Sequence, residues 1–119
     1  MKRQELIDKW LEALESGEYK QGKRALATET PNGEFRFCCL GVVCVEAGIE
    51  KDLLIGLSYL PEKIAKKLGI EDGGSFIVGV THRGRRYKNL ASMNDAGVRF
   101  KTIARIIREN LENKNFEKP

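Results

Sequence analysis

The chain has 119 residues, of which 41% are hydrophobic and 32% charged, a mixture typical of a globular domain rather than a disordered or fibrous chain. Residues 1–119 are therefore predicted to form a single domain, with a frayed tail from about residue 113. The net charge of +4 arises from 21 basic and 17 acidic residues, so anionic partners are permitted and the clustering of the cations decides their binding. No apolar run reaches the roughly 20 residues that cross a bilayer, which predicts a cytoplasmic protein without a membrane partner.

The first part of the chain predicts a helix, a hairpin and a second helix. Apolar side chains recur on one side of a helical wheel over residues 2–16, and Gly17 follows as a stop signal. Residues 24–30 and 34–38 predict antiparallel strands, because Pro31-Asn32-Gly33 between them is turn chemistry. Residues 39–47 are apolar nearly all round, and their valines leave a strand as the rival interpretation. Their i, i+3, i+4, i+7 spacing favours a buried central helix.

The second part predicts short elements around a second hairpin. Residues 53–60 show no clear pattern, and Pro61 then opens a short helix that ends at Gly69. A strand over residues 75–81 and another that includes Arg86 and Tyr87 flank a turn at Gly84. A brief helix is expected over residues 90–95 and the last helix over about residues 99–110.

Together these elements predict an α+β fold. A small antiparallel sheet, with hairpins near residues 24–38 and 75–88, packs with an N-terminal helix, a buried central helix and a C-terminal helix. Such a small domain leaves little room for an internal catalytic cleft. A ligand site shared between subunits is the expected solution.

No catalytic machinery can be recognised. Cys38, Cys39 and Cys44 punctuate the most apolar segment, which favours buried, reduced thiols over a nucleophile. Zinc would need further ligands, and the chain has one histidine, His82. Neither glycine-containing loop has the spacing of a phosphate-binding loop. The sequence therefore predicts no enzyme, no metal site and no cofactor.

Two clusters of cations are candidates for binding. Residues 82–88 place four arginine and lysine side chains at the tip of the second hairpin, and Lys101, Arg105 and Arg108 lie on one flank of the last helix. The alternative interpretation is that both clusters are solvated faces that aid only solubility. Arginine forks suit phosphates, and the neighbouring aromatic side chains favour binding.

Several segments carry a resemblance to a known family of small phage and prophage proteins. These are residues 10–22, the string Phe37-Cys38-Cys39-Leu40-Gly41-Val42, the string Tyr59-Leu60-Pro61, and residues 90–100 before Ile103-Ala104. The chain also resembles the phage Thoeris anti-defence proteins in size. That resemblance implies a non-enzymatic homo-oligomer with sites at subunit boundaries. It would sequester cyclic ADP-ribose-type signals, with cyclic oligonucleotides held in separate pockets, and so block host anti-phage defence.

A cyclic nucleotide presents phosphates, a ring for stacking and base edges, and each group has candidate partners here. Arg24, Arg105 and Arg108 are the phosphate candidates, Phe76 and Tyr87 the stacking candidates, and Asn94 the base-reading candidate. Structural alternatives exist: Phe76 as a core residue, Asn94 as a turn former and Arg24 as a strand cation. The rival functions are nucleic-acid binding through the basic hairpin and last helix, and inhibition of a host protein through an apolar patch.

Overall fold

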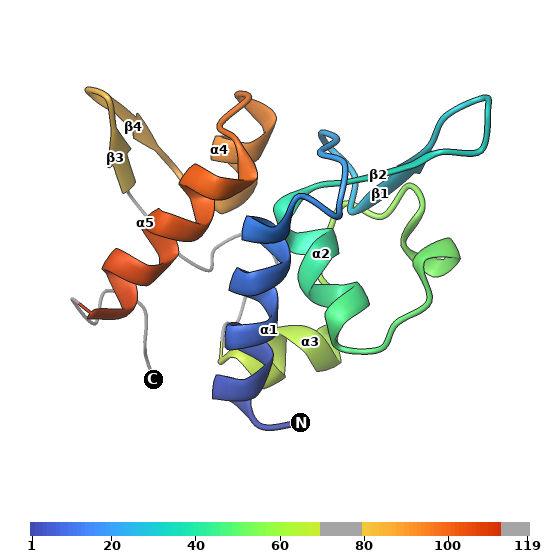
Figure 1. Cartoon of the computed structure of the whole chain (residues 1–119), viewed down its shortest axis with the longest axis horizontal. Coiled ribbons are helices and arrows are strands. Elements are labelled where there is room, and N and C mark those ends of the chain that lie inside the picture. The colour runs from blue at the N-terminus through green and yellow to red at the C-terminus, as the bar shows by residue number, and fades with distance from the viewer. Residues whose placement is uncertain (70–79, 113–119) are drawn as a thin grey trace.

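Five α-helices and two hairpins follow one another along the described residues, 1–69 and 80–112, of the computed structural model (Figure 1). In chain order the elements are α1 (Arg3–Ser16), β1 (Ala27–Glu29), β2 (Phe35–Phe37), α2 (Cys39–Glu46), the 3-10 helix η1 (Lys51–Leu54), α3 (Glu62–Leu68), β3 (Val80–His82), β4 (Arg85–Tyr87), α4 (Leu90–Asp95) and α5 (Phe100–Glu112). The α+β prediction is confirmed. The segment without a clear pattern, residues 53–60, provides the end of η1 and an extended connection.

Helix α2 lies at the centre of the core, as its all-round apolar sequence predicts. Every residue from Cys39 to Cys44 is buried, and the helix packs against α1 and α4. The indole Nε1 of Trp10, itself fully buried, donates a hydrogen bond to the carbonyl oxygen of Cys39 at 2.8 Å. This bond satisfies the polar end of the largest core side chain, since a buried indole N–H without a partner would be costly.

The strand alternative for residues 39–47 is wrong, since Cys39–Glu46 form a helix. A Cβ atom placed on Gly41 would lie 1.9 Å from the carbonyl oxygen of Leu26, so α2 passes directly against the backbone that leads into β1. The N–H group of Cys38 donates to that same carbonyl at 3.3 Å. The missing side chain at Gly41 therefore allows helix and hairpin to meet at backbone distance.

The two hairpins form two separate two-stranded sheets, and the prediction that they share one sheet is wrong. In the first hairpin Ala27 pairs with Phe37, and in the second Val80 pairs with Tyr87. The outer edges of the first hairpin are already bridged, by Ile55 beside Ala27 and by Gln21 beside Phe37. Neither edge remains open for the second hairpin, which lies over α5 on the other side of the molecule (Figure 1).

Several predicted boundaries move. Strand β1 begins at Ala27 rather than at residue 24, because Arg24 has a left-handed φ of 75° that no strand accommodates. Helix α5 begins at Phe100, and Pro61 is the residue before α3 rather than its first. Residues 75–79 of the expected strand and the expected tail, 113–119, lie outside the described residues. Over residues 1–69 and 80–112, no helix combines the length and apolar character needed to cross a membrane.

Candidate functional site

Asn94, the base-reading candidate, is a hub of the core. Its side chain is 0% exposed. Its Oδ1 accepts from Gln21 Nε2 at 2.9 Å and from the N–H of Cys39 at 3.1 Å, while its Nδ2 donates to the carbonyl oxygen of Gly22 at 2.8 Å. The amide thus joins α4 to the start of α2 and to the loop after α1. A buried amide with these partners stabilises the fold and presents no edge to a ligand in this structure.

Gln21 extends this hub to the start of α5. Its Nε2 also donates to the carbonyl oxygen of Val98 at 2.7 Å, and its Oε1 accepts from the N–H of Phe100 at 3.1 Å. The loop after α1 and the segment before α5 are therefore held side by side. Sequence reasoning missed Gln21, since a single glutamine in a loop has no periodic or motif signal.

Two of the predicted phosphate ligands are paired with carboxylates. Arg108 makes two hydrogen bonds of 2.9 Å, through Nε and Nη2, to the Glu15 carboxylate on α1. Arg105 pairs with Glu109 one turn along α5 at 3.1 Å. The Arg108 hydrogen bonds lower the pKa of Glu15, and the same bonds raise the pKa of Arg108. These cations are engaged in structural pairs, and neither lines a hollow beside the start of α5.

Cations without such partners gather around a hollow of about 430 Å³ between the β3–β4 hairpin and the start of α5, which we call the hairpin hollow. Its lining consists of His82, Arg83, Arg85, Tyr87, Ala96, Gly97, Val98, Arg99 and Thr102. None of the five salt bridges among the described residues involves Arg83, Arg85 or Arg99. Three guanidinium groups of exposed residues thus surround one concave surface.

The hairpin turn presents one of these arginines in a constrained conformation. Arg83 has a φ of 53° and Gly84 a φ of 77°, the paired left-handed geometry of a two-residue turn that suits the twist of the strands. A left-handed conformation at a residue with a side chain costs roughly 1 kcal/mol or more. The turn therefore holds Arg83 at the rim of the hairpin hollow.

Tyr87, the stacking candidate, lies in the wall of the hairpin hollow but offers little free ring surface. Its side chain is 8% exposed, and the Arg85 guanidinium carbon lies 5.0 Å from the centre of its ring. This cation–π contact orients the guanidinium over the aromatic face. Tyr87 thus positions Arg85, and a planar ligand would meet the guanidinium before the tyrosine ring.

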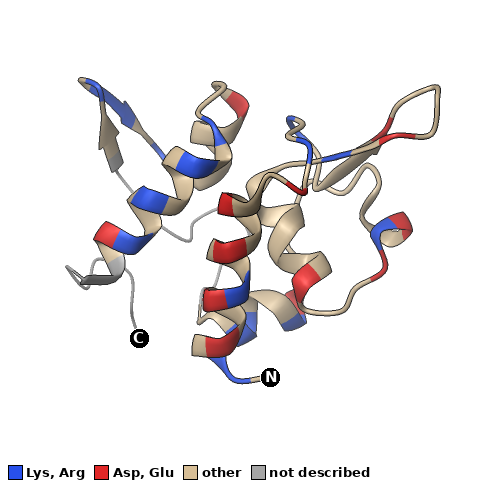
Figure 2. Cartoon of the chain, viewed as in Figure 1, with Lys and Arg blue, Asp and Glu red and all other residues tan. Residues whose placement is uncertain are grey.

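Arg24 lies in the loop that extends this basic surface beyond the hairpin hollow. Its backbone N–H donates to Asp95 Oδ1 at 2.8 Å, which holds the loop against the end of α4. A Cβ atom on Gly97 would lie 3.9 Å from the Lys23 ammonium nitrogen, so Lys23 stands beside a residue of the hollow lining. Figure 2 shows lysine and arginine along the hairpin, the start of α5 and this loop. Phe76, the other stacking candidate, lies outside the described residues.

A second hollow of about 420 Å³, the α1 hollow, lies between the end of α1 and the start of α5. Its lining comprises Leu14, Gly17, Tyr19, Gln21, Arg99, Phe100 and Lys101. Arg99 belongs to both hollows, which are therefore neighbours. The α1 hollow has the more apolar lining, with cations at its rim.

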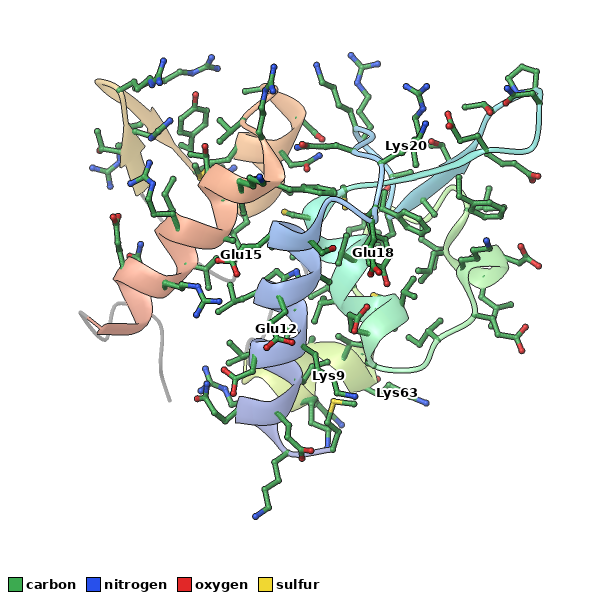
Figure 3. All side chains as sticks on the ribbon, viewed as in Figure 1. Lys9, Glu12, Glu15, Glu18, Lys20 and Lys63 are labelled. Atoms are coloured by element: carbon green, nitrogen blue, oxygen red, sulfur yellow. The ribbon has the colours of Figure 1, made fainter. Side chains whose placement is uncertain are left out.

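Acidic side chains occupy a different part of the surface. Glu12, Glu15 and Glu18 follow the exposed side of α1 into the next loop (Figure 3), and Glu12 and Glu18 line a third hollow of about 350 Å³ with Glu46. The Glu46 carboxylate accepts from the Tyr19 hydroxyl at 2.6 Å. Burial and this hydrogen bond raise the pKa of Tyr19. An anionic ligand is repelled from this side of α1.

The cysteines are packed as the sequence predicts. Cys38, Cys39 and Cys44 are buried and reduced, and desolvation raises all three thiol pKa values, that of Cys44 to about 12. Thiolates are therefore scarce at neutral pH. No group of three or more metal-ligating side chains occurs within residues 1–69 and 80–112.

A family model described as "Domain of unknown function (DUF8296)" matches residues 1–54, the segment that contains α1, the first hairpin, α2 and η1. No curated protein and no solved structure matches the chain. The matched segment includes the buried cysteine helix and the loop with Lys23 and Arg24. The hairpin hollow is lined by residues 82–102, after the matched segment.

Proposed function

We propose that the chain is a non-enzymatic binding protein that captures a small cyclic nucleotide in the hairpin hollow and so withholds it from a host defence effector. The observation that carries this proposal is the convergence of Arg83, Arg85 and Arg99, none of them in a described salt bridge, on one concave surface. Guanidinium groups recognise phosphates through paired hydrogen bonds. Cyclic ADP-ribose-type signals are the class implied by the resemblance to phage Thoeris anti-defence proteins.

Two further features support a nucleotide over a simple anion. The Arg85 guanidinium, held over the Tyr87 ring, is a flat cation on which a purine can stack. The volume of about 430 Å³ falls within the usual range of ligand sites, roughly 300–1,000 Å³. Thr102 adds a hydroxyl group to the wall, which can donate to a phosphate or a ribose oxygen.

A thermal-shift screen of cyclic ADP-ribose isomers tests the proposal. A ligand bound only by the folded state at about 100 times its Kd adds about 2.7 kcal/mol, which raises the Tm of a domain of this size by roughly 10 °C. Arg85→Ala and Arg99→Ala should each weaken binding about tenfold or more, because each removes a charge-assisted hydrogen bond. Lys63→Ala on α3, far from the hairpin in Figure 3, is the matched control.

Capture and catalysis are separated by the fate of the ligand. A protein that only captures its ligand should release the cyclic nucleotide chemically intact on heat denaturation. Recovery of a hydrolysed product would contradict capture. If no cyclic nucleotide raised the Tm of the parent chain, and Arg85→Ala gave the same Tm with and without ligand, the cyclic nucleotide would be excluded as the ligand.

Nucleic-acid binding is the second candidate, favoured by the continuity of the basic surface from Lys23 across Gly97 to the hairpin. Binding along a phosphate backbone releases one counterion for nearly every phosphate contacted, so affinity falls steeply with salt. Fluorescence anisotropy with a short duplex over a range of salt concentrations distinguishes the two. A steep slope that loses about one unit in Arg86→Ala would favour nucleic acid, because Arg86 lies outside the hairpin hollow lining.

The resemblance also leads us to propose a homo-oligomer in the cytoplasm of the infected host, with each hollow completed at a subunit boundary. Both hollows open to solvent in the single chain, as expected for half-sites that a neighbouring subunit closes. Light scattering coupled to size exclusion should then give a multiple of 13.4 kDa. A monomeric mass at micromolar concentration, with or without ligand, would contradict this.

A further inference from the structure

We propose that the chain assembles head to tail, with an exposed apolar turn of one copy, residues 53–59, docked in the α1 hollow of the next copy. The inference rests on the proposed homo-oligomer and names the two surfaces that meet at the subunit boundary. One chain carries both: an apolar projection with carboxylates beside it, and an apolar hollow with cations at its rim.

The apolar turn holds most of the large apolar side chains that the fold leaves in solvent. Leu53, Ile55, Leu57 and Tyr59 are 67, 42, 41 and 76% exposed, and they are four of the five such side chains in the described part of the chain. Exposed apolar side chains scattered singly are normal on a monomer. A group of them in one short segment indicates an interaction surface.

The backbone of the apolar turn is fixed. Ile55 has a φ of −60° and a ψ of 124°, and Gly56 has a φ of 78°. The N–H of Leu57 donates to the carbonyl oxygen of Leu54 at 3.1 Å, which completes a type II turn. The N–H of Gly56 also donates to the carbonyl oxygen of Ala27 in β1 at 3.1 Å. Because turns are usually built from polar residues, a fixed turn that exposes isoleucine and leucine is preorganised for an apolar contact.

Carboxylates lie next to the apolar turn. Glu50 and Asp52 are exposed, and neither takes part in a salt bridge among the described residues. Lys51 lies between them in sequence, and its ammonium nitrogen is 4.5 Å from the centre of the Phe35 ring, so this cation is directed toward the first hairpin. The carboxylates are therefore available to cations of a partner.

The α1 hollow is the matching surface. Leu14 and Phe100 contribute apolar lining, and Arg99 and Lys101 contribute cations. Both cations are exposed and lie outside the described salt bridges. Tyrosine is among the side chains that most often anchor interfaces in pockets, so Tyr59, the most exposed of the turn, is the expected anchor. The carboxylates beside the turn then face the cations of the hollow, which sets the orientation of the two copies.

The two surfaces lie on different sides of the molecule, so the contact joins different copies. In Figure 1, α1 and α2 stand between η1 and α5. An interface between unlike surfaces is heterologous: each copy gives its turn to one neighbour and accepts the turn of another, which builds a ring or a filament. Because Arg99 lines both hollows, the docked turn lies beside the hairpin hollow, and the neighbouring copy adds a wall to the ligand site.

Two double variants and their mixture test the contact. Leu57→Asp with Tyr59→Asp disables the turn, and Arg99→Glu with Lys101→Glu disables the hollow. By sedimentation velocity, the parent chain should form assemblies of more than two copies, and each double variant alone should be a monomer of 13.4 kDa. Mixed in equal amounts, the two variants should form a pair of twice that mass, because each retains the surface that the other lacks.

Two further variants serve as controls. Lys63→Glu with Lys67→Glu, at exposed positions of α3, carries the same change of charge as the hollow variant and should leave assembly unchanged. Tyr59→Ser introduces no charge and should raise the dissociation constant of the assembly at least tenfold. The mixed pair also reports folding, since it forms only if both double variants are folded.

The outcomes separate the contact from the proposed function. A mixture that stays monomeric while the parent chain assembles would overturn the head-to-tail contact and leave the homo-oligomer standing. So would a hollow variant that still assembles, which would indicate that two turns meet each other. A parent chain that is monomeric at micromolar concentration would overturn both the contact and the homo-oligomer, whereas capture of a cyclic nucleotide is decided by the thermal-shift screen.

Discussion

Single residues of the Phe37–Val42 string are explained by packing rather than by ligand binding. The backbone N–H of Cys38 donates to the Leu26 carbonyl oxygen at 3.3 Å, and that of Cys39 donates to Asn94 Oδ1 at 3.1 Å. The carbonyl oxygen of Cys39 accepts from the Trp10 indole. Gly41 provides the close approach to Leu26. Residues 37–42, which carry the family resemblance, thus hold α2 in the core through hydrogen bonds and close packing.

Gly41→Ala is expected to destabilise the fold by about 3 kcal/mol or more, because the added methyl group would overlap the Leu26 carbonyl and backbone cannot move aside easily. Gly33→Ala is the control. Gly33 has a φ of 85° but open space around the added carbon, so only conformational strain of about 1 kcal/mol is expected. Urea denaturation measures both, and equal losses would contradict the close approach.

Asn94→Ala is expected to cost about 2–4 kcal/mol, since it leaves the N–H of Cys39, the carbonyl of Gly22 and the amide of Gln21 without their partner in the core. Gln4→Ala removes an exposed amide that donates to Asp8 in the next turn, and should cost less than about 0.5 kcal/mol. Denaturant midpoints compare the two. A neutral Asn94→Ala would mean that water replaces these bonds.

Pairs of elements are held by polar contacts that sequence patterns do not show, and the Glu15–Arg108 pair between α1 and α5 is the clearest. Because the pKa of Glu15 is lowered in the folded chain, its stabilisation is complete at neutral pH. It is lost as the pH falls through the ordinary glutamate range and then through the lowered value. The side chains are 39% and 47% exposed, so the contribution is at most about 1 kcal/mol.

Glu15→Gln should therefore lower the free energy of unfolding by up to about 1 kcal/mol near pH 7, and the gap to the parent chain should narrow and close as the pH falls through the ordinary glutamate range and below the lowered pKa of Glu15. Added salt should narrow the gap at neutral pH as well. Glu29→Gln, a change at an exposed strand position, controls for the lost charge. A gap that persists unchanged in acid would show that Glu15 acts through packing.

Across the whole molecule, the buried cysteines report on opening of the core. Cys39 and Cys44, in helix α2, are 0% exposed, and Cys38, the residue before that helix, is 6% exposed. Helices α1 and α4 pack against α2. Alkylation by iodoacetamide at pH 8 should be slow in the folded chain and fast for all three thiols in denaturant, since a buried thiol reacts only through opening. Mass spectrometry counts the adducts. Rapid labelling of one thiol in the folded chain would locate a local opening there.

The separation along the chain between interacting residues explains what could be predicted from the sequence. Helix α1 and helix α5 follow from periodicity over three turns or more, and the buried thiols follow from their position in the most apolar stretch of the chain. The hairpins follow from turn residues a few positions apart. Each of these features depends on residues close together in the chain, where propensity and pattern act directly.

The tertiary structure determines which cations are available to a ligand. The sequence predicts Arg105 and Arg108 as cations on one flank of the last helix, yet Arg105 pairs with Glu109 four residues on and Arg108 pairs with Glu15 across 93 residues. The hub of Gln21 and Asn94 spans 73 residues, and the hollows arise where the segments it joins meet the hairpin and α1. Side-chain pairing over such separations depends on how the chain closes on itself, so local pattern predicted the elements and the fold selected the site.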